Sequence, residues 1–98
     1  MRIVTYKRIK EFTEKHAASE NALNFWYHTV RAKEWKDLND IRQTFNSADS
    51  VGNNRYVFNI KGNDYRLDAI ISFNAQKVYI RFIGTHWQYD KIKDIKNS

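Results

Sequence analysis

The side chains best suited to chemistry in this sequence gather in its second half, where cationic donors stand near groups that can move protons. The donors are Arg66 and Arg81, which fall on neighbouring predicted strands. The proton-moving groups are His86, Tyr89 and Asp90, and spacings of three and four residues place them on one side of a helical turn. Such a set suits metal-independent cleavage of RNA, in which the ribose 2′-hydroxyl attacks the adjacent phosphate.

Each residue type in this set has a role in that reaction. Charge develops on the non-bridging phosphate oxygens, and fixed guanidinium groups stabilise it. A general base takes the 2′ proton and a general acid protonates the leaving 5′ oxygen, and histidine can serve as either. A tyrosine can take part if nearby cations lower its pKa. Arg55 and Lys61 stand near the set in the sequence and could help to hold RNA.

The same residues also admit an ordinary structural explanation. Arg66 and Arg81 could simply pair with Asp68 and Asp90 as ion pairs, which many proteins carry without any catalytic role. From the residues alone, both explanations stay open.

The alternation of apolar and polar residues predicts a sheet that would position the arginines. Three runs at 55–60, 65–73 and 78–83 alternate with period two, which is typical of antiparallel strands with one buried face. The predicted buried face collects Tyr56, Phe58, Ile60, Tyr65, Leu67, Ala69, Ile71, Phe73, Val78, Ile80 and Phe82. The mixed face carries Arg55, Arg66, Arg81 and Ile83, and an anion between Arg66 and Arg81 would relieve their repulsion across the ladder. Gly84 is predicted to end the last strand, and Thr85 to cap the helical turn after it.

Helical spacing of apolar residues predicts the cover for the buried face. Segments 6–16 and 20–33 read as amphipathic helices, the second with Leu23 and Trp26 in the core and Ser19 as its N-cap. A third, short helix is predicted to begin after Asp37. Residues 1–5 favour a strand that can pair with an edge of the sheet, and the polar stretch 46–54 reads as a loop.

Length and composition limit the number of domains and the kinds of partner and site that the chain can have. The 98 residues fit a single domain over 1–98, and a net charge of +6 with 15% aromatic residues suits a polyanion partner or simply a well-dispersed basic protein. The absence of cysteine excludes thiolate metal sites, and the three histidines are too widely spaced for a local metal cluster, so we expect no metal and no cofactor. No segment resembles a membrane span or a signal peptide, so we expect a cytoplasmic protein.

Two motifs in the second half of the chain resemble the HigB toxin family, within the wider RelE/ParE-like superfamily. They read Arg55-x-Val57-Phe58-Asn59-Ile60-x-Gly62-Asn63-x-Tyr65-Arg66-Leu67 and Tyr79-Ile80-Arg81-Phe82-Ile83-Gly84-Thr85-His86-x-x-Tyr89-Asp90. The likeness extends weakly into the N-terminal helices, including Ala32-x-x-Trp35, and so covers nearly the whole chain.

The resemblance implies a RelE-like α+β fold, with two to three N-terminal helices packed on one face of a small antiparallel sheet and a short C-terminal helical turn. It implies an mRNA endoribonuclease that cuts translated messages on the ribosome and so inhibits translation and growth. A cognate HigA antitoxin, usually a helix-turn-helix protein, is the implied partner.

The same resemblance implies roles for individual residues. Arg66 matches the arginine expected at the scissile phosphate, and His86, Tyr89 and Asp90 match the C-terminal active-site cluster, with Asp90 orienting His86. The cations predicted to hold RNA are Arg55, Lys61, Arg81 and Lys91. Which member of the cluster is acid and which is base stays open. ParE-like relatives share the fold but poison gyrase, so a non-catalytic gyrase inhibitor or basic RNA-binding protein is the alternative.

Overall fold

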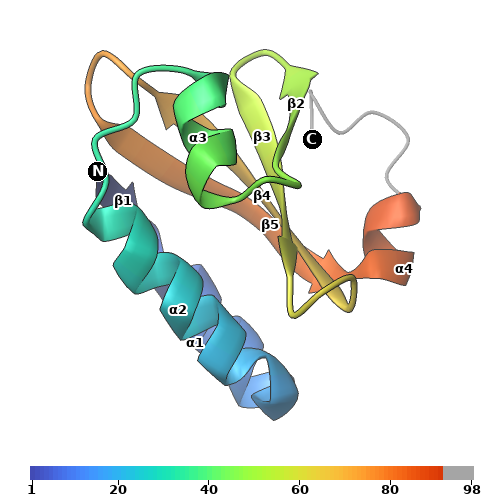
Figure 1. Ribbon diagram of the computed structural model, residues 1–98. Coiled ribbons are helices and arrows are strands. Elements are labelled where there is room, and N and C mark those ends of the chain that lie inside the picture. The colour runs from blue at the N-terminus through green and yellow to red at the C-terminus, as the bar shows by residue number, and fades with distance from the viewer. Residues whose placement is uncertain (92–98) are drawn as a thin grey trace.

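A five-stranded sheet forms the centre of the computed structural model, which describes residues 1–91 (Figure 1). The strands are β1 (Arg2–Val4), β2 (Asp49–Gly52), β3 (Arg55–Ile60), β4 (Tyr65–Ser72) and β5 (Lys77–Thr85), and they lie in the order β1-β5-β4-β3-β2. Strands β2 to β5 are antiparallel neighbours, whereas β1 runs parallel to β5. The predicted α+β class and edge pairing of residues 1–5 are confirmed, but the sheet is mixed rather than antiparallel throughout.

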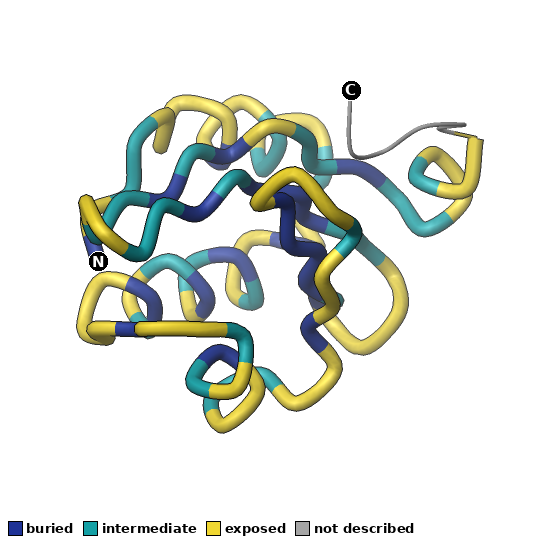
Figure 2. Tube along the Cα trace, turned by 90° about the horizontal axis from the view of Figure 1, so that it is seen from above, coloured by how far each residue is buried: buried dark blue, intermediate teal, exposed yellow. Residues whose placement is uncertain are grey.

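Three helices cover one face of the sheet, and a fourth stands at its far end (Figure 1). The helices are α1 (Tyr6–Lys15), α2 (Glu20–Arg31), α3 (Leu38–Thr44) and α4 (His86–Asp90), with a 3₁₀ turn at Ala17–Ser19. The covering helices bring Ile9, Leu23, Trp26 and Ile41 into the same core as the strands. Figure 2 shows buried residues along the strands and on the helices, with exposed residues at most of the turns. No helix within residues 1–91 is long and apolar enough to cross a membrane.

The predicted buried face of the sheet is confirmed over β3, β4 and the first half of β5. Its fully or nearly fully buried members are Tyr56, Phe58, Ile60, Leu67, Ala69, Ile71, Val78 and Ile80. Tyr65 and Phe73 are partly buried and pack against the same core. The period-two alternation therefore predicted the inward side chains correctly as far as Ile80.

A bulge in β5 reverses the faces after that point. Asp68 is paired with Phe82, whereas the next residue of β4 is paired with Ile80, so Arg81 is an extra residue in the ladder. One extra residue moves every later side chain to the opposite face. Ile83 therefore packs against the core, and Phe82 lies on the mixed face with Asp68. The predictions that Phe82 was buried in the core and Ile83 faced the mixed side are both wrong.

The segment 46–54, predicted to be a loop, contains the edge strand β2. It pairs with β3 through a register shift between Ser50 and Gly52, where Gly52 has a φ of +94° that favours glycine. The polar sequence of β2 shows no alternation, so only its pairing with β3 reveals it. Because β2 flanks β3 on the side away from β4, β3 is an interior strand of the sheet.

Two predicted helix caps have different outcomes. The Asp37 carboxylate accepts a hydrogen bond from the Asp40 N–H at 3.0 Å, which confirms the cap of α3. The Ser19 side chain does not cap α2, because its hydroxyl donates to the His16 carbonyl at 2.7 Å within the 3₁₀ turn. The helices end at Lys15 and Arg31, one and two residues before their predicted ends.

Candidate active site

Helix α4 is fixed against the end of the sheet by a capping box and a backbone hydrogen bond. The Thr85 hydroxyl accepts from the Gln88 N–H at 3.1 Å, and the Gln88 side chain accepts from the Thr85 N–H at 2.8 Å, which confirms the predicted Thr85 cap. The His86 N–H donates to the Asp64 carbonyl at 3.1 Å. The turn between β3 and β4 is thereby tied to the start of α4 (Figure 1).

His86 and Asp90 form an ion-pair geometry along α4. The imidazole Nδ1 lies 3.0 Å from the Asp90 Oδ2, and the two side chains are 43% and 57% exposed. A carboxylate that accepts from Nδ1–H holds the ring in one orientation and leaves Nε2 for another partner. Within residues 1–91 the imidazole Nε2 makes no hydrogen bond, so this nitrogen can serve a ligand that binds beside α4.

Arg66 lies on the mixed face of the sheet, directly beside α4. Its Cζ is 5.4 Å from the centroid of the Tyr89 ring, a distance at which a guanidinium is attracted to the face of the ring. Its Nη1 donates to the Asn59 side-chain oxygen, whereas its buried Nε has no hydrogen-bond partner in the described part of the chain. Gly84 is the residue paired with Arg66 on β5. Arg66 is therefore held in place with donor capacity left over, and it is not part of the hydrophobic core.

Burial keeps Tyr89 in its neutral form. Desolvation raises the pKa of the Tyr89 phenol, the charge of Arg66 lowers it, and Asp68, Asp49 and Asp90 raise it further. The net shift is upward. The condition set for Tyr89, a pKa lowered by nearby cations, is not met, because burial and three carboxylates outweigh one guanidinium. At neutral pH the phenol can donate a hydrogen bond, but it is not a ready base.

Arg55 and Asp68 form a buried ion pair. The Arg55 Nη1 lies 2.9 Å from the Asp68 Oδ2, and their side chains are only 7% and 0% exposed. Burial raises the pKa of the Asp68 carboxyl, the hydrogen bond and charge of Arg55 lower it, and the charge of Arg81 lowers it a little more, with a net upward shift. The geometry does not favour the RNA contact predicted for Arg55, because a buried carboxylate already occupies its guanidinium.

The predicted ion pairs of Arg66 and Arg81 are not those of the structure. Asp68 pairs with Arg55, and Asp90 pairs with His86. The register also opposes Gly84, rather than Arg81, to Arg66. The close approach of the two arginines across the ladder is therefore wrong, because the bulge places Arg81 apart from that pairing.

The remaining predicted RNA contacts lie around α4 and the bulge, all on exposed residues. Lys61 is in the turn between β3 and β4, which the Asp64 carbonyl links to α4. Arg81 is the bulged residue of β5. Lys91 follows α4 directly, and its Nζ lies 3.6 Å from the centroid of the Trp87 ring. These cations lie at separate points, so they suit an extended anion better than a small one.

Gly84 is a residue of this site that the sequence patterns did not assign. It was predicted to end the strand, but it is a buried interior residue of β5. A Cβ at this position would clash with the Phe82 Cζ and would lie 2.9 Å from the Gln88 Oε1. The absent side chain makes room for the Phe82 ring and for the capping box of α4. Nothing in the local sequence distinguishes this use of glycine from a turn.

Replacing Gly84 by alanine is therefore expected to destabilise the fold by about 1–3 kcal/mol, the usual cost of overpacking. The new methyl group must displace the Phe82 ring or the Gln88 side chain. Urea unfolding of Gly84→Ala would measure the loss. Phe82→Leu lacks the clashing ring atom, so the double variant should lose much less stability than the two single losses added together. Strict additivity would show that the clash with Phe82 is not the cause.

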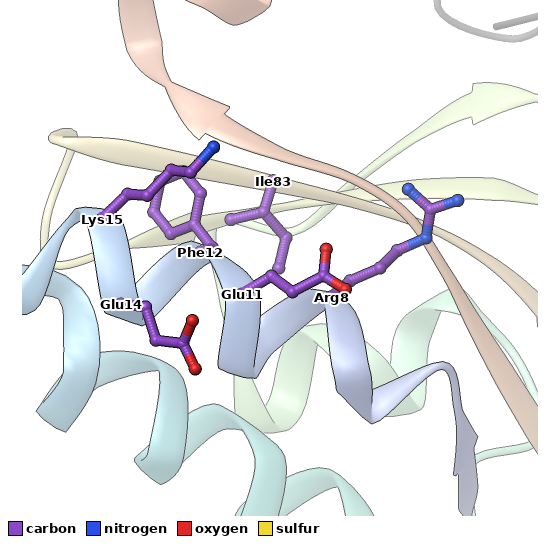
Figure 3. Close-up of a pocket in the computed structure, with 6 residues that line it drawn as sticks. All are labelled: Arg8, Glu11, Phe12, Glu14, Lys15 and Ile83. Carbon is purple, nitrogen blue, oxygen red and sulfur yellow. The ribbon is translucent and has the colours of Figure 1, made fainter.

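A separate hollow lies between α1 and the end of β5, as Figure 3 shows. Its lining residues are Arg8, Glu11, Phe12, Glu14, Lys15 and Ile83. Two cations and two carboxylates line it, and it contains none of the residues gathered around α4. This mixed charge gives no preference for an anion, so we do not place the functional site there.

The groups around α4 can together bind a phosphate and transfer a proton. Arg66 supplies a fixed positive charge, His86 a free ring nitrogen and Tyr89 a neutral phenol. Within residues 1–91, no three His, Asp or Glu side chains lie close enough together to hold a metal ion. The arrangement is suited to acid–base chemistry at a phosphodiester.

Comparisons with known proteins identify relatives that match nearly the whole chain. Residues 19–92 match the family model described as HigB_toxin, RelE-like toxic component of a toxin-antitoxin system. The chain is 33% identical over 92 residues to the "mRNA interferase toxin HigB" of Escherichia coli (strain K12), which covers 92% of this chain and 88% of that protein. The "mRNA interferase HigB" of Shigella flexneri gives the same values. That of Escherichia coli O6:H1 is 26% identical over 94% of this chain and 91% of its own length.

Proposed function

Because this chain belongs to the HigB toxin family of RelE-like toxic components of toxin–antitoxin systems, we propose that it is an mRNA interferase. It is an endoribonuclease that inhibits translation and growth by cutting messages. We further propose that it cuts them on the ribosome while they are translated. The observation that carries the proposal is the placement of Arg66 on the mixed face of the sheet. There it lies beside helix α4, which holds His86, Tyr89 and Asp90.

In the proposed reaction, the ribose 2′-oxygen attacks the adjacent phosphorus and the 5′-oxygen leaves with its electron pair. Arg66 stabilises the negative charge that develops on the non-bridging oxygens. The Nε2 of His86 either takes the 2′ proton or protonates the leaving oxygen, and Asp90 holds the ring for this transfer. Tyr89, neutral at physiological pH, donates a hydrogen bond and packs its ring against Arg66. Lys61, Arg81 and Lys91 hold the flanking phosphates.

We also propose a HigA-like helix-turn-helix antitoxin as the protein partner, and the cytoplasm as the place of action. Both proposals rest on the family, whose members are the toxic halves of toxin–antitoxin systems. A neighbouring reading frame that encodes a small helix-turn-helix protein, and that relieves growth inhibition when both genes are expressed, would support the first. Failure of every neighbouring gene product to relieve it would contradict it.

Mapping mRNA ends after induction tests the proposed activity. We expect new 5′ ends inside translated frames, and we expect them to disappear when the start codon of a reporter message is removed. A gyrase inhibitor with the same fold would instead cause DNA damage without new mRNA ends. A basic RNA-binding protein would give neither.

His86→Gln is expected to slow cleavage by about 100- to 10,000-fold, the usual contribution of a general acid or base. Tyr89→Phe keeps the ring beside Arg66 and should cost at most about 10-fold, because it removes one neutral hydrogen bond of about 0.5–1.5 kcal/mol. Since the pKa of Tyr89 is raised, its phenol stays protonated through neutral pH, and Tyr89→Phe should leave the pH profile of cleavage unchanged there. Single-turnover rates across pH measure both effects. Loss of the alkaline limb in Tyr89→Phe would show that the phenol transfers a proton.

A further inference from the structure

Trp87 is a large apolar side chain that the protein leaves in water. It is 66% exposed, whereas Trp26 and Trp35, the other tryptophans of the chain, are 1% and 2% exposed. It lies on α4, one residue after His86. Exposed apolar side chains are common, but an exposed indole next to a candidate catalytic histidine can mark a binding site.

The helix places Trp87 and Lys91 together on the side of α4 next to that of His86 and Asp90. Residues four apart share one face, and successive residues turn by about 100°. The Lys91 Nζ is 3.6 Å from the centroid of the Trp87 ring, so one face of the indole is held by a cation. The ring nevertheless stays 66% exposed, which leaves apolar surface for a flat ligand.

We propose that Trp87 stacks on a nucleobase of the RNA bound at the candidate active site, with Lys91 fixing the orientation of the ring. This inference rests on the proposed function and names a substrate contact for it. Every base has a π face, and stacking on an aromatic side chain suits single-stranded RNA whose bases are unpaired. A base held beside His86 would fix which phosphodiester reaches Arg66.

The positive charges around α4 favour RNA over an apolar protein partner for this ring. Lys91 contacts the indole itself, and Lys61 stands in the turn tied to the start of the same helix. An apolar protein partner would have to desolvate these ammonium groups, whereas a nucleotide offers a base to the ring and a phosphate to the cations.

Phe25 provides a matched control. It is 67% exposed, almost the same fraction as Trp87, but it lies on α2, which covers the opposite face of the sheet (Figure 1). Truncation of either ring removes a comparable exposed aromatic surface. Only the loss of the Trp87 ring should weaken RNA binding.

The native chain carries its own probe for the test. Because the other two tryptophans are buried, a base that quenches indole fluorescence can reach only Trp87. We expect a 2′-O-methylated oligoribonucleotide, which cannot be cleaved, to quench the native protein and Phe25→Ala but not Trp87→Phe. By fluorescence anisotropy of the labelled oligonucleotide, Trp87→Ala should bind about 5- to 100-fold more weakly than Phe25→Ala, and Trp87→Phe should restore part of the loss.

Cleavage on ribosomes programmed with a defined message separates this inference from the proposed activity. We expect Trp87→Ala to raise KM or shift the cut position, with the circular dichroism spectrum unchanged. Trp87→Ala that binds and cuts like the native chain would overturn the stacking contact while leaving the nuclease intact. A native chain that makes no cuts would overturn the proposed function itself. Unaltered RNA binding with weakened antitoxin binding would assign Trp87 to a protein interface and equally overturn the inference.

Discussion

Replacing Arg66 by alanine is expected to slow RNA cleavage by about 100- to 1,000-fold and to abolish growth inhibition, the cost of losing one fixed donor to a developing charge. The guanidinium is held by the Asn59 side chain and the Tyr89 ring, yet its Nε has no hydrogen-bond partner among residues 1–91. Arg66 as a whole is only partly buried. The phosphate of a bound message is the ligand that the proposed reaction supplies to its guanidinium.

Arg66→Lys is the matched control for this prediction. Lysine keeps the positive charge but loses the planar fork that can bind two phosphate oxygens at once, so it should recover only part of the rate. Cleavage of a reporter message, growth after induction and thermal unfolding should be measured for each variant. Normal toxicity from a folded Arg66→Ala protein would remove this residue from the mechanism.

Most of the fold could be predicted because one face of the sheet must be buried. The alternation at 55–73 has a single register that buries most of its apolar side chains on one face, and the structure adopts it. The apolar stripe with Leu23 and Trp26 likewise has one orientation that covers this face. Polar segments carry no such constraint, so β2 was missed.

The bulge in β5 could not be predicted from the sequence. After Ile80, the side chains of Phe82 and Ile83 are both apolar, so either one could have faced the core. The pattern therefore does not distinguish a regular strand from a bulged one. The space left by Gly84 accommodates Phe82 on the mixed face, and this depends on three-dimensional contacts that no local pattern contains.

The site was predictable where a single element determines the geometry. The four-residue spacing of His86 and Asp90 on a capped turn brings their side chains together, as the helical period requires. The position of Arg66 on the mixed face follows from the strand period. The pairing of Arg55 with Asp68 was missed because it depends on how deeply the mixed face is buried, and the sequence does not determine that. The raised pKa of Tyr89 was missed for the same reason, because it too depends on burial that the sequence does not determine.

Arg55→Met is expected to lower the free energy of unfolding by about 3–5 kcal/mol, because it leaves the fully buried Asp68 without its partner. The loss should depend on pH. The pKa of Asp68 is already raised by burial, and removing the lowering effect of Arg55 must raise it further. In acid, Asp68 is protonated in both proteins and the difference shrinks. As the pH rises to neutral, ionising Asp68 costs the native protein some stability, since its pKa is raised even beside Arg55. The variant must bury a lone charge or keep a proton, which costs more, so the difference grows.

The double variant Arg55→Met with Asp68→Leu distinguishes two roles of Arg55, neutralising Asp68 and contacting RNA. Replacing a buried ion pair by apolar side chains of similar size is often neutral for stability, so the double variant should regain most of the loss in urea unfolding. If Arg55 only neutralises Asp68, the double variant should also cut RNA at nearly the native rate. A stable double variant with strongly impaired cleavage would restore Arg55 to the RNA contacts that its position in the sequence suggested. A double variant as unstable as Arg55→Met would instead show that the lone carboxylate is not the source of the instability.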